Sequence, residues 1–202
     1  FEIPSGHQIE LYATKTFTGC DRGEKDPAHY SPKMDKGIAP MRFDHALLYG
    51  PNVDKVLDLF TNVLGFHLAE YVTLPGSDVK GALWLCCSNK AHDIAFVVHP
   101  EPAKLHHVSF YMESVERVFR AADIMATHNV KVDIGPTRHG ITRGGTIYAW
   151  DPSGNRFETY SGGNSTYPDL PPIAWSWEGL GEGGGLDVAH RKLHETFLTV
   201  VT

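Results

Sequence analysis

The chain has few cysteines, no long apolar run and no recognisable signal peptide, and each of these absences argues against a class of protein. Its three cysteines, Cys20, Cys86 and Cys87, are too few for a disulfide framework, which favours a reducing compartment, the cytoplasm. No apolar stretch approaches the length that a bilayer requires. The sequence therefore predicts a cytoplasmic protein without a membrane span.

The chain also lacks a concentration of positive charge. Eighteen Lys and Arg residues stand against 24 Asp and Glu residues, for a formal net charge of −6 with His neutral. Without a basic block, a nucleic-acid or anionic-membrane binder is not expected. The hydrophobic content of 42% is ordinary for a globular domain. Histidine is the residue in excess, with 12 copies, so each copy needs its own argument.

A repeated pattern relates two of the histidines to each other. Residues 43–48 and 105–110 both read as a strand followed by an amphipathic helix, and a shift of 62 positions maps His45 onto His107. Apolar residues at helical spacing then predict helices over 53–64, with Asn52 as N-cap, and after Ser114. Further strands are expected near 66–74, 80–87 and 92–98 in the first module, and near 130–135, 144–150 and 155–160 in the second. The sequence thus predicts an α+β fold of two βαβββ modules, residues 43–99 and 105–161.

Segments outside these modules carry weaker patterns. Pro4-Ser5-Gly6 and the residues that follow match Pro152-Ser153-Gly154 at a shift of 148, so residues 1–12 read as the last strand of a missing N-terminal domain. Residues 13–41 read as a linker rich in Gly, Pro, Lys and Asp. We expect a catalytic domain over 42–161 and a C-terminal tail over 162–202 with a short helix near 186–195.

Strand alternation assigns a face to each repeated histidine. Ala46 and Leu48 suit packing under the helix, so His45 points into the concavity of the sheet, and His107 does the same in the second module. Glu158, in the last strand of the second module, is a candidate third ligand. Two His and one carboxylate with open positions opposite them are typical of non-haem Fe(II) oxygenases.

The same shift of 62 places Phe96 at the position related to Glu158, so the expected fourth position is apolar. His92, His139 and Tyr148 are proton carriers that the expected strands bring near the same cavity. His106 is expected to face away from it, because His107 faces it. His190 and His194 have helical i, i+4 spacing, but without a Glu-x-x-His frame we interpret them as a solvated face.

Four motifs at defined spacing resemble the signature of a known family: Thr137-Arg138-His139, Ile147-Tyr148, Asp151-Pro152-Ser153-Gly154 and Glu158. The pattern is similar to that of extradiol ring-cleavage dioxygenases of the vicinal oxygen chelate superfamily, nearest to the catechol 2,3-dioxygenase (metapyrocatechase) branch. Residues 105–112 and 197–202 point the same way. The resemblance implies paired βαβββ modules in an open, strongly curved mixed sheet, barrel-like, with the helices outside (the glyoxalase-like fold).

The resemblance also implies a function and its residues. Fe(II) would be held by His45, His107 and Glu158, and the enzyme would cleave catechol or a substituted catechol with O2 to 2-hydroxymuconate semialdehyde, in aromatic hydrocarbon degradation. His92 would act as acid–base toward the bound oxygen species, while His139 and Tyr148 would hydrogen-bond the phenolic oxygens. The expected ring pocket consists of Leu47, Trp84, Ile141 and Thr142. A homotetramer is implied as well.

Two other functions are compatible with the fold. A glyoxalase or epimerase of the same superfamily would use four protein ligands and no O2, and the apolar Phe96 counts against it. A metal-free binding module would need no converging ligands, although a fold alone does not decide function. Mn(II) accepts the same ligands as Fe(II), so the metal stays open at this point, as does the preferred catechol.

Overall fold

The structure is a computed structural model that describes residues 1–18, 23, 25, 37–192 and 194–201. Cys20 and much of the expected linker lie outside the described residues. The strands are β1 (Arg42–Gly50), β2 (His67–Thr73), β3 (Lys80–Cys86), β4 (Ile94–Val98), β5 (Lys104–Tyr111), β6 (Val132–Arg138), β7 (Gly144–Trp150), β8 (Arg156–Gly162) and β9 (Ile173–Trp175). The helices are α1 (Val53–Asn62), α2 (Val115–Thr127) and α3 (Trp177–Leu180), and a 3-10 helix spans Glu195–Leu198.

A single mixed sheet joins the two modules through their first strands. The strand order is β6-β7-β8-β5-β1-β4-β3-β2-β9. β1 and β5 are antiparallel, with Ala46 opposite Val108, so a pseudo-twofold axis passes between them. β4 joins β1 and β8 joins β5 in parallel, which repeats the same arrangement on each side. The expected α+β fold of paired βαβββ modules is confirmed.

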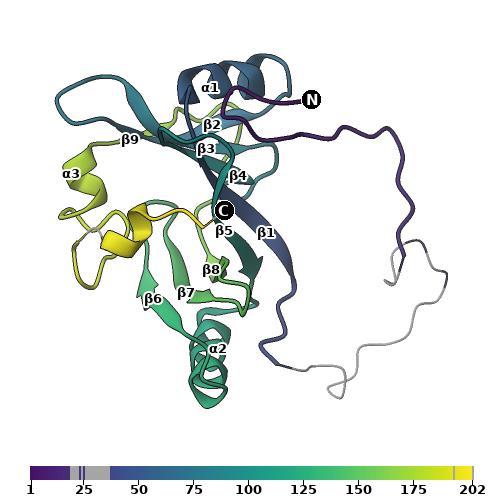
Figure 1. Cartoon of the computed structure of the whole chain (residues 1–202), viewed down its shortest axis with the longest axis vertical. Coiled ribbons are helices and arrows are strands. Elements are labelled where there is room, and N and C mark those ends of the chain that lie inside the picture. Colours follow the sequence, from purple (N-terminus) through teal and green to yellow (C-terminus); the bar gives the residue numbers. More distant parts are fainter. Residues whose placement is uncertain (19–22, 24, 26–36, 193, 202) are drawn as a thin grey trace.

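The helices lie outside the curved sheet, α1 beyond the β1–β4 half and α2 beyond the β5–β8 half (Figure 1). Beneath α1, Val53, Val56 and Phe60 are buried against β3 and β4. Ser114 caps α2 as expected, because its side chain accepts a hydrogen bond from the backbone N–H of the third residue of the helix at 3.4 Å.

Some details of the helices differ from expectation. Asn52 does not cap α1 with its side chain, because its left-handed backbone (φ 58°) turns the amide toward the carbonyl oxygen of Pro4, 3.1 Å away. Val63, which falls within the helix expected over 53–64, lies just after the end of α1 and is exposed. Phe119 is exposed too, since α2 buries a narrower face, centred on Val118 and Met125.

The C-terminal tail departs most from the sequence prediction. The helix expected near 186–195 is wrong, because residues 186–192 form turns and only the 3-10 helix at Glu195–Leu198 is helical in that region. The tail instead adds β9 to the edge of the sheet, in parallel with β2. It then crosses the open side of the curved sheet (Figure 1), where Leu180, Leu186 and Phe197 join the concave-face core.

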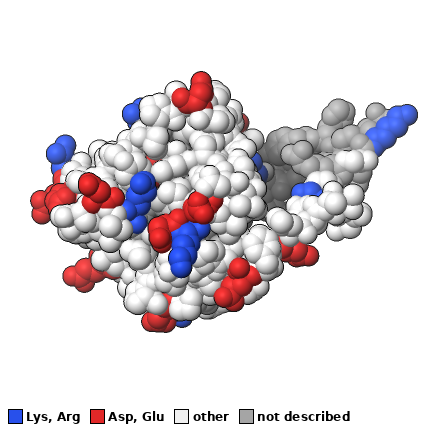
Figure 2. Space-filling model, turned by 90° about the horizontal axis from the view of Figure 1, so that it is seen from above, with Lys and Arg blue, Asp and Glu red and all other residues white. Residues whose placement is uncertain are grey.

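Near the N-terminus, Glu2 and Gln8 form an isolated β-bridge, and Ile3 packs into the core beneath α1. Among the described residues, no helix combines the length and apolarity needed to cross a bilayer. On the face drawn in Figure 2, acidic and basic side chains are dispersed among uncharged ones, and the described residues form no continuous basic surface there.

Candidate active site

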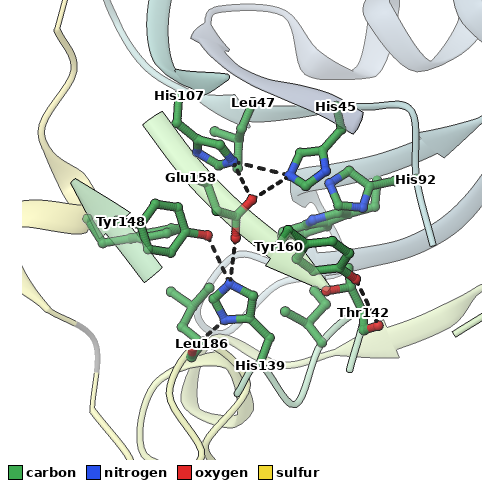
Figure 3. A pocket seen from close by; sticks show the side chains of 13 residues that line it. His45, Leu47, His92, His107, His139, Thr142, Tyr148, Glu158, Tyr160 and Leu186 are labelled. Carbon is green, nitrogen blue, oxygen red and sulfur yellow. Dashed lines mark hydrogen bonds and ion pairs between the residues drawn. The ribbon is translucent and has the colours of Figure 1, made fainter. Parts of the chain in front are cut away.

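Three of the expected side chains meet on the concave face of the sheet. His45 on β1, His107 on β5 and Glu158 on β8 point toward one another (Figure 3), and all three are buried. The Nε2 atoms of the two imidazoles are 3.3 Å apart. Glu158 Oε2 lies 2.9 Å from His45 Nε2 and 3.5 Å from His107 Nε2. The parallel β5–β8 pairing produces this meeting, because it sets Glu158 opposite Ser109, which itself lies opposite His45.

The position related to Glu158 by the pseudo-twofold axis is Ala95, and the expectation that it is Phe96 is wrong. In the β1–β4 pair Leu47 lies opposite Ala95, just as Ser109 lies opposite Glu158 in the β5–β8 pair. The two modules therefore differ by 63 positions at their last strands, one more than at their first strands. Phe96 consequently faces α1 in the outer core, while Ala95 lies on the concave face. The fourth position is still apolar, but it is occupied by a methyl group.

Asp44 orients His45. Its Oδ2 lies 2.9 Å from His45 Nδ1, and its other oxygen is paired with Arg42. Burial lowers the pKa of His45, but Asp44 and Glu158 outweigh burial and raise that pKa above its ordinary value. A carboxylate on Nδ1 leaves Nε2 of a neutral imidazole with a free lone pair, which is the arrangement that metal-binding histidines use.

His107 is oriented by the preceding histidine. The Nδ1 atoms of His106 and His107 are 2.6 Å apart, and the His106 ring otherwise packs, tilted, against the rings of Phe197 and Tyr49. His106 thus faces away from the cavity, as alternation predicts. Burial lowers the pKa of His107 to about 4, so this imidazole is neutral near pH 7.

Glu158 is ionised despite its burial. Burial favours the neutral acid, but the imidazoles of His107, His139 and His45 hold the pKa of Glu158 well below its ordinary value. Thr146 donates a hydrogen bond to its Oε1. Among the residues that the structure describes, none donates a hydrogen bond to Oε2, although this oxygen is buried.

This arrangement fits a divalent cation. A buried anionic oxygen without a donor is costly, and a cation between it and the two Nε2 atoms would remove that cost. Two imidazoles and a carboxylate suit both Fe(II) and Mn(II). The same three residues are the only wholly buried group in the described chain whose His, Cys, Asp or Glu ligand atoms lie within 4.8 Å of one another.

His139 and Tyr148 form a hydrogen-bonded pair beside Glu158. His139 Nε2 lies 2.8 Å from the Tyr148 hydroxyl and 3.6 Å from Glu158 Oε1. His139 Nδ1 is bonded to the carbonyl oxygen of Leu186, which requires the imidazole to carry its proton there. A neutral His139 therefore accepts from Tyr148 through Nε2, and burial raises the pKa of Tyr148 well above its ordinary value.

His92 lies on the other side of the cluster, just before β4. Its ring centroid is 3.9 Å from that of His45. Burial, reinforced by the nearby His45, lowers the pKa of His92 well below its ordinary value, and among the described residues its Nδ1 has no hydrogen-bond partner. His92 is thus a neutral base whose ring borders the cavity.

All of the residues proposed from the sequence line one small cavity (Figure 3). The lining comprises His45, His107, Glu158, His92, His139, Tyr148, Leu47, Trp84, Ile141 and Thr142, together with Tyr160, Leu186 and Phe197. The cavity thus combines the three ligand candidates and further polar side chains with an apolar wall of aliphatic and aromatic residues.

Comparison with known proteins assigns the family. A family model described as Glyoxalase/Bleomycin resistance protein/Dioxygenase superfamily matches residues 42–159. The chain belongs to this superfamily. Its nine-stranded, strongly curved mixed sheet is the vicinal oxygen chelate fold, and the superfamily match covers the two modules from the first residue of β1 into β8.

Within the superfamily the relatives include ring-cleaving dioxygenases. The chain is 47% identical to a metapyrocatechase from Pseudomonas sp. (strain CF600), over 100% of this chain and 65% of that protein. It is 35% identical to a manganese-dependent 2,3-dihydroxybiphenyl 1,2-dioxygenase from Geobacillus genomosp. 3, over 91% of this chain and 60% of that protein. The chain thus spans less than two thirds of the length of these relatives.

A solved structure, the 2,3-dioxygenase LapB from Pseudomonas sp. KL28, superposes with a TM-score of 0.82 at 58% identity, over 88% of this chain and 62% of that one. The superfamily fold therefore extends from the paired modules into most of the chain.

Several residues around this cavity were not predicted from the sequence. Tyr160 lies two positions after Glu158 on the same face, so alternation along β8 could have revealed it. Asp44 was missed because alternation turns it away from His45; a register shift in the β1–β5 pair between Phe43 and His45 brings both side chains together. Leu186 and Phe197 come from turns and a 3-10 helix, where no periodicity marks a buried position.

Proposed function

We propose that the protein is an Fe(II)-dependent extradiol dioxygenase. It would open the ring of catechol, or of a substituted catechol, with O2 to give 2-hydroxymuconate semialdehyde in the breakdown of aromatic hydrocarbons. The observation that carries the proposal is the meeting of His45, His107 and Glu158 on one wall of a cavity that also holds His92, His139 and Tyr148. A glyoxalase or epimerase site would need a fourth polar ligand, and Ala95 supplies none.

His45, His107 and Glu158 would hold the iron, which would supply the redox chemistry that joins catechol to O2. The three candidate ligands all come from the strands β1, β5 and β8, and the opposite side of the cluster opens into the cavity. This one-sided arrangement supports an oxygenase, because it leaves room for substrate and O2 beside the metal. One relative is manganese-dependent by name, so metal analysis of the purified protein is part of the test.

The cavity residues would then position catechol and handle its protons. Tyr148 keeps its proton because burial raises its pKa, so with catechol bound its hydroxyl would donate to a phenolic oxygen in place of His139. His139, whose Nδ1 proton is held by Leu186, would then accept a hydrogen bond from a phenolic hydroxyl through Nε2. His92, neutral because burial lowers its pKa, would take up and return a proton on the opposite side.

The remaining walls would select a flat aromatic ring. Leu47, Trp84 and Ile141 are almost fully buried and line the cavity with apolar surface. Such walls exclude water and favour a planar hydrocarbon over a sugar or a flexible polar substrate.

The test begins with anaerobic loading of the protein with Fe(II), followed by addition of catechol and air-saturated buffer. We expect one molecule of the yellow ring-fission product to form for each molecule of O2 consumed. Glu158→Ala should lose bound iron together with activity, whereas His128→Asn, an exposed histidine on the α2 side, should match the wild type. Catechol binding without O2 uptake would instead indicate a binding module, and would refute the proposal.

We further propose that residues 42–161 are the catalytic unit, that the protein works in the cytoplasm, and that it assembles as a homotetramer. The free thiols of Cys86 and Cys87 support a reducing compartment. The assembly follows from the family resemblance alone. Light scattering of the purified protein at micromolar concentration tests it, and a monomer would contradict it.

A further inference from the structure

A second group of ligand-type side chains lies outside the cavity, on the turns that follow α3. Asp187, His190 and His194 bring a carboxylate oxygen and two imidazole nitrogens within 4.8 Å of one another. Asp187 Oδ2 is 2.8 Å from His190 Nδ1 and 2.7 Å from His194 Nε2. The two histidines therefore do not lie on one face of a helix, as their spacing suggested; a turn directs both imidazole rings at one oxygen of Asp187.

We propose that these three residues form a second metal site, for a divalent cation of the zinc class. Two imidazoles and one carboxylate are a common three-residue set for Zn(II), and water completes a tetrahedron. The proposal does not depend on the dioxygenase function, because it concerns different residues and a different ion.

The Asp187 carboxylate is buried and held in one orientation, unlike a typical surface carboxylate. Its side chain is only 1% exposed. Its Oδ1 accepts hydrogen bonds from Thr137 Oγ1 at 2.7 Å and from the backbone N–H groups of Ala189 and His190, each at 3.0 Å. These donors occupy one oxygen and leave Oδ2 facing the two imidazoles. Such outer contacts are what fixes the direction of a metal-binding carboxylate.

The surroundings of the Asp187 carboxylate also favour its ionised form. Burial favours the neutral acid, but the hydrogen bonds from His194 and Thr137 outweigh it and hold the pKa of Asp187 below its ordinary value. Metal binding therefore needs only that each neutral imidazole carries its proton on the other ring nitrogen.

The present contacts are slightly too short to enclose an ion, and both imidazoles have room to adjust. Metal–ligand bonds of about 2.0–2.1 Å in a tetrahedron separate neighbouring ligand atoms by about 3.3 Å. The two Asp187 contacts must therefore lengthen by about half an ångström. The imidazoles can make these movements, because the side chain of His190 is 61% exposed and that of His194 is 21% exposed, whereas Asp187 is held by its hydrogen bonds.

The site adjoins a wall of the catalytic cavity. The carbonyl oxygen that fixes His139 belongs to Leu186, the residue before Asp187. His194 lines a small enclosed space together with Tyr148 and Phe197. An ion that joins Asp187 to His194 would therefore tie down the segment that covers His139, so it should stabilise the tail of the protein.

The experiment counts zinc in iron-loaded protein after anaerobic equilibrium dialysis against micromolar Zn(II). We expect the wild type and His128→Asn to retain one zinc more per chain than His190→Asn and His194→Asn. Glu158→Ala should retain this zinc, because its defect lies in the other cluster. Equal zinc content in the wild type and both His variants would overturn the proposal, and would leave the cluster as a hydrogen-bonded turn only.

Thermal unfolding is the second readout. Zinc should raise the Tm of the wild type and of His128→Asn, and should leave that of His190→Asn unchanged, since an ion that binds only the folded state stabilises it. His190 is exposed, so its replacement does not threaten folding. A Tm rise of the same size in His190→Asn would place the zinc elsewhere and refute the site.

Discussion

Arg156 has a fully buried guanidinium that ties β8 to the C-terminal segment over the cavity. Its Nε donates to Asp133 Oδ2 at 2.9 Å, and its two terminal nitrogens donate to the carbonyl oxygens of His106, Thr196 and Thr199. The guanidinium also stacks on Trp150, 4.3 Å from the ring centroid. We predict that Arg156→Met, which keeps an unbranched apolar stem and removes every side-chain donor, lowers the free energy of unfolding strongly.

The size of the effect follows from what the substitution leaves behind. Asp133, whose side chain is 5% exposed, would lose its cation, and breaking a buried pair from one side costs about 3–5 kcal/mol. Each carbonyl oxygen left unsatisfied in the interior costs about 1–3 kcal/mol, although such terms overlap. We therefore expect a loss of about 4 kcal/mol, of which Asp133→Asn in the same chain should recover about 1–2 kcal/mol because it removes the stranded charge.

Urea unfolding of the wild type, both Arg156 variants and the exposed-site control Arg120→Met measures this loss, with the control expected within about 0.5 kcal/mol of the wild type. The substrate KM should rise as well, because Phe197, a wall of the cavity, lies between the two residues that Arg156 holds. A loss below about 1 kcal/mol for Arg156→Met would refute the reasoning, since it would mean that water replaces the guanidinium without cost.

Three further predictions test the metal centre, the pH dependence and the packing. Asp44→Asn should weaken metal affinity about 10–100-fold, because His45 loses its orienting carboxylate; chelator competition measures this, and an unchanged affinity would contradict it. For Asp93, burial is outweighed by the ion pair with Lys90 at 2.8 Å, so its pKa is lowered and its stabilisation is present above pH about 4 and lost as the pH falls further. Urea unfolding from pH 7 to 3 should therefore show the deficit of Asp93→Asn shrinking in acid, and a constant deficit would contradict the assignment. In Gly144→Ala the added methyl group would overlap the ring of Tyr160, so the free energy of unfolding should fall by about 1–3 kcal/mol in the same assay. An unchanged free energy of unfolding would show that this ring can move.

The pairing of His45 with His107 was predictable because it rests on local rules. Alternation within a strand and a constant shift between two modules can both be recognised in the sequence alone. The antiparallel pairing of β1 and β5 then brings the two histidines close together. The role of Phe96 was mistaken because the second module has one more position between β5 and β8 than the first module has between β1 and β4, and a shift of one position places a strand residue on the other face.

The sequence by itself determined the two modules, the faces of their first strands and the candidate ligands His45, His107 and Glu158, because those features depend on periodicity and spacing along the chain. Only the tertiary structure decided which tail residues close the cavity, that Asp44 reaches His45, and that Asp187 collects two histidines. The Asp44 contact depends on a register shift within β1, which the order of residues does not reveal. The tail contacts and the Asp187 cluster lie on irregular backbone, where long-range packing and hydrogen bonds set the direction of each side chain and no periodicity marks the partners.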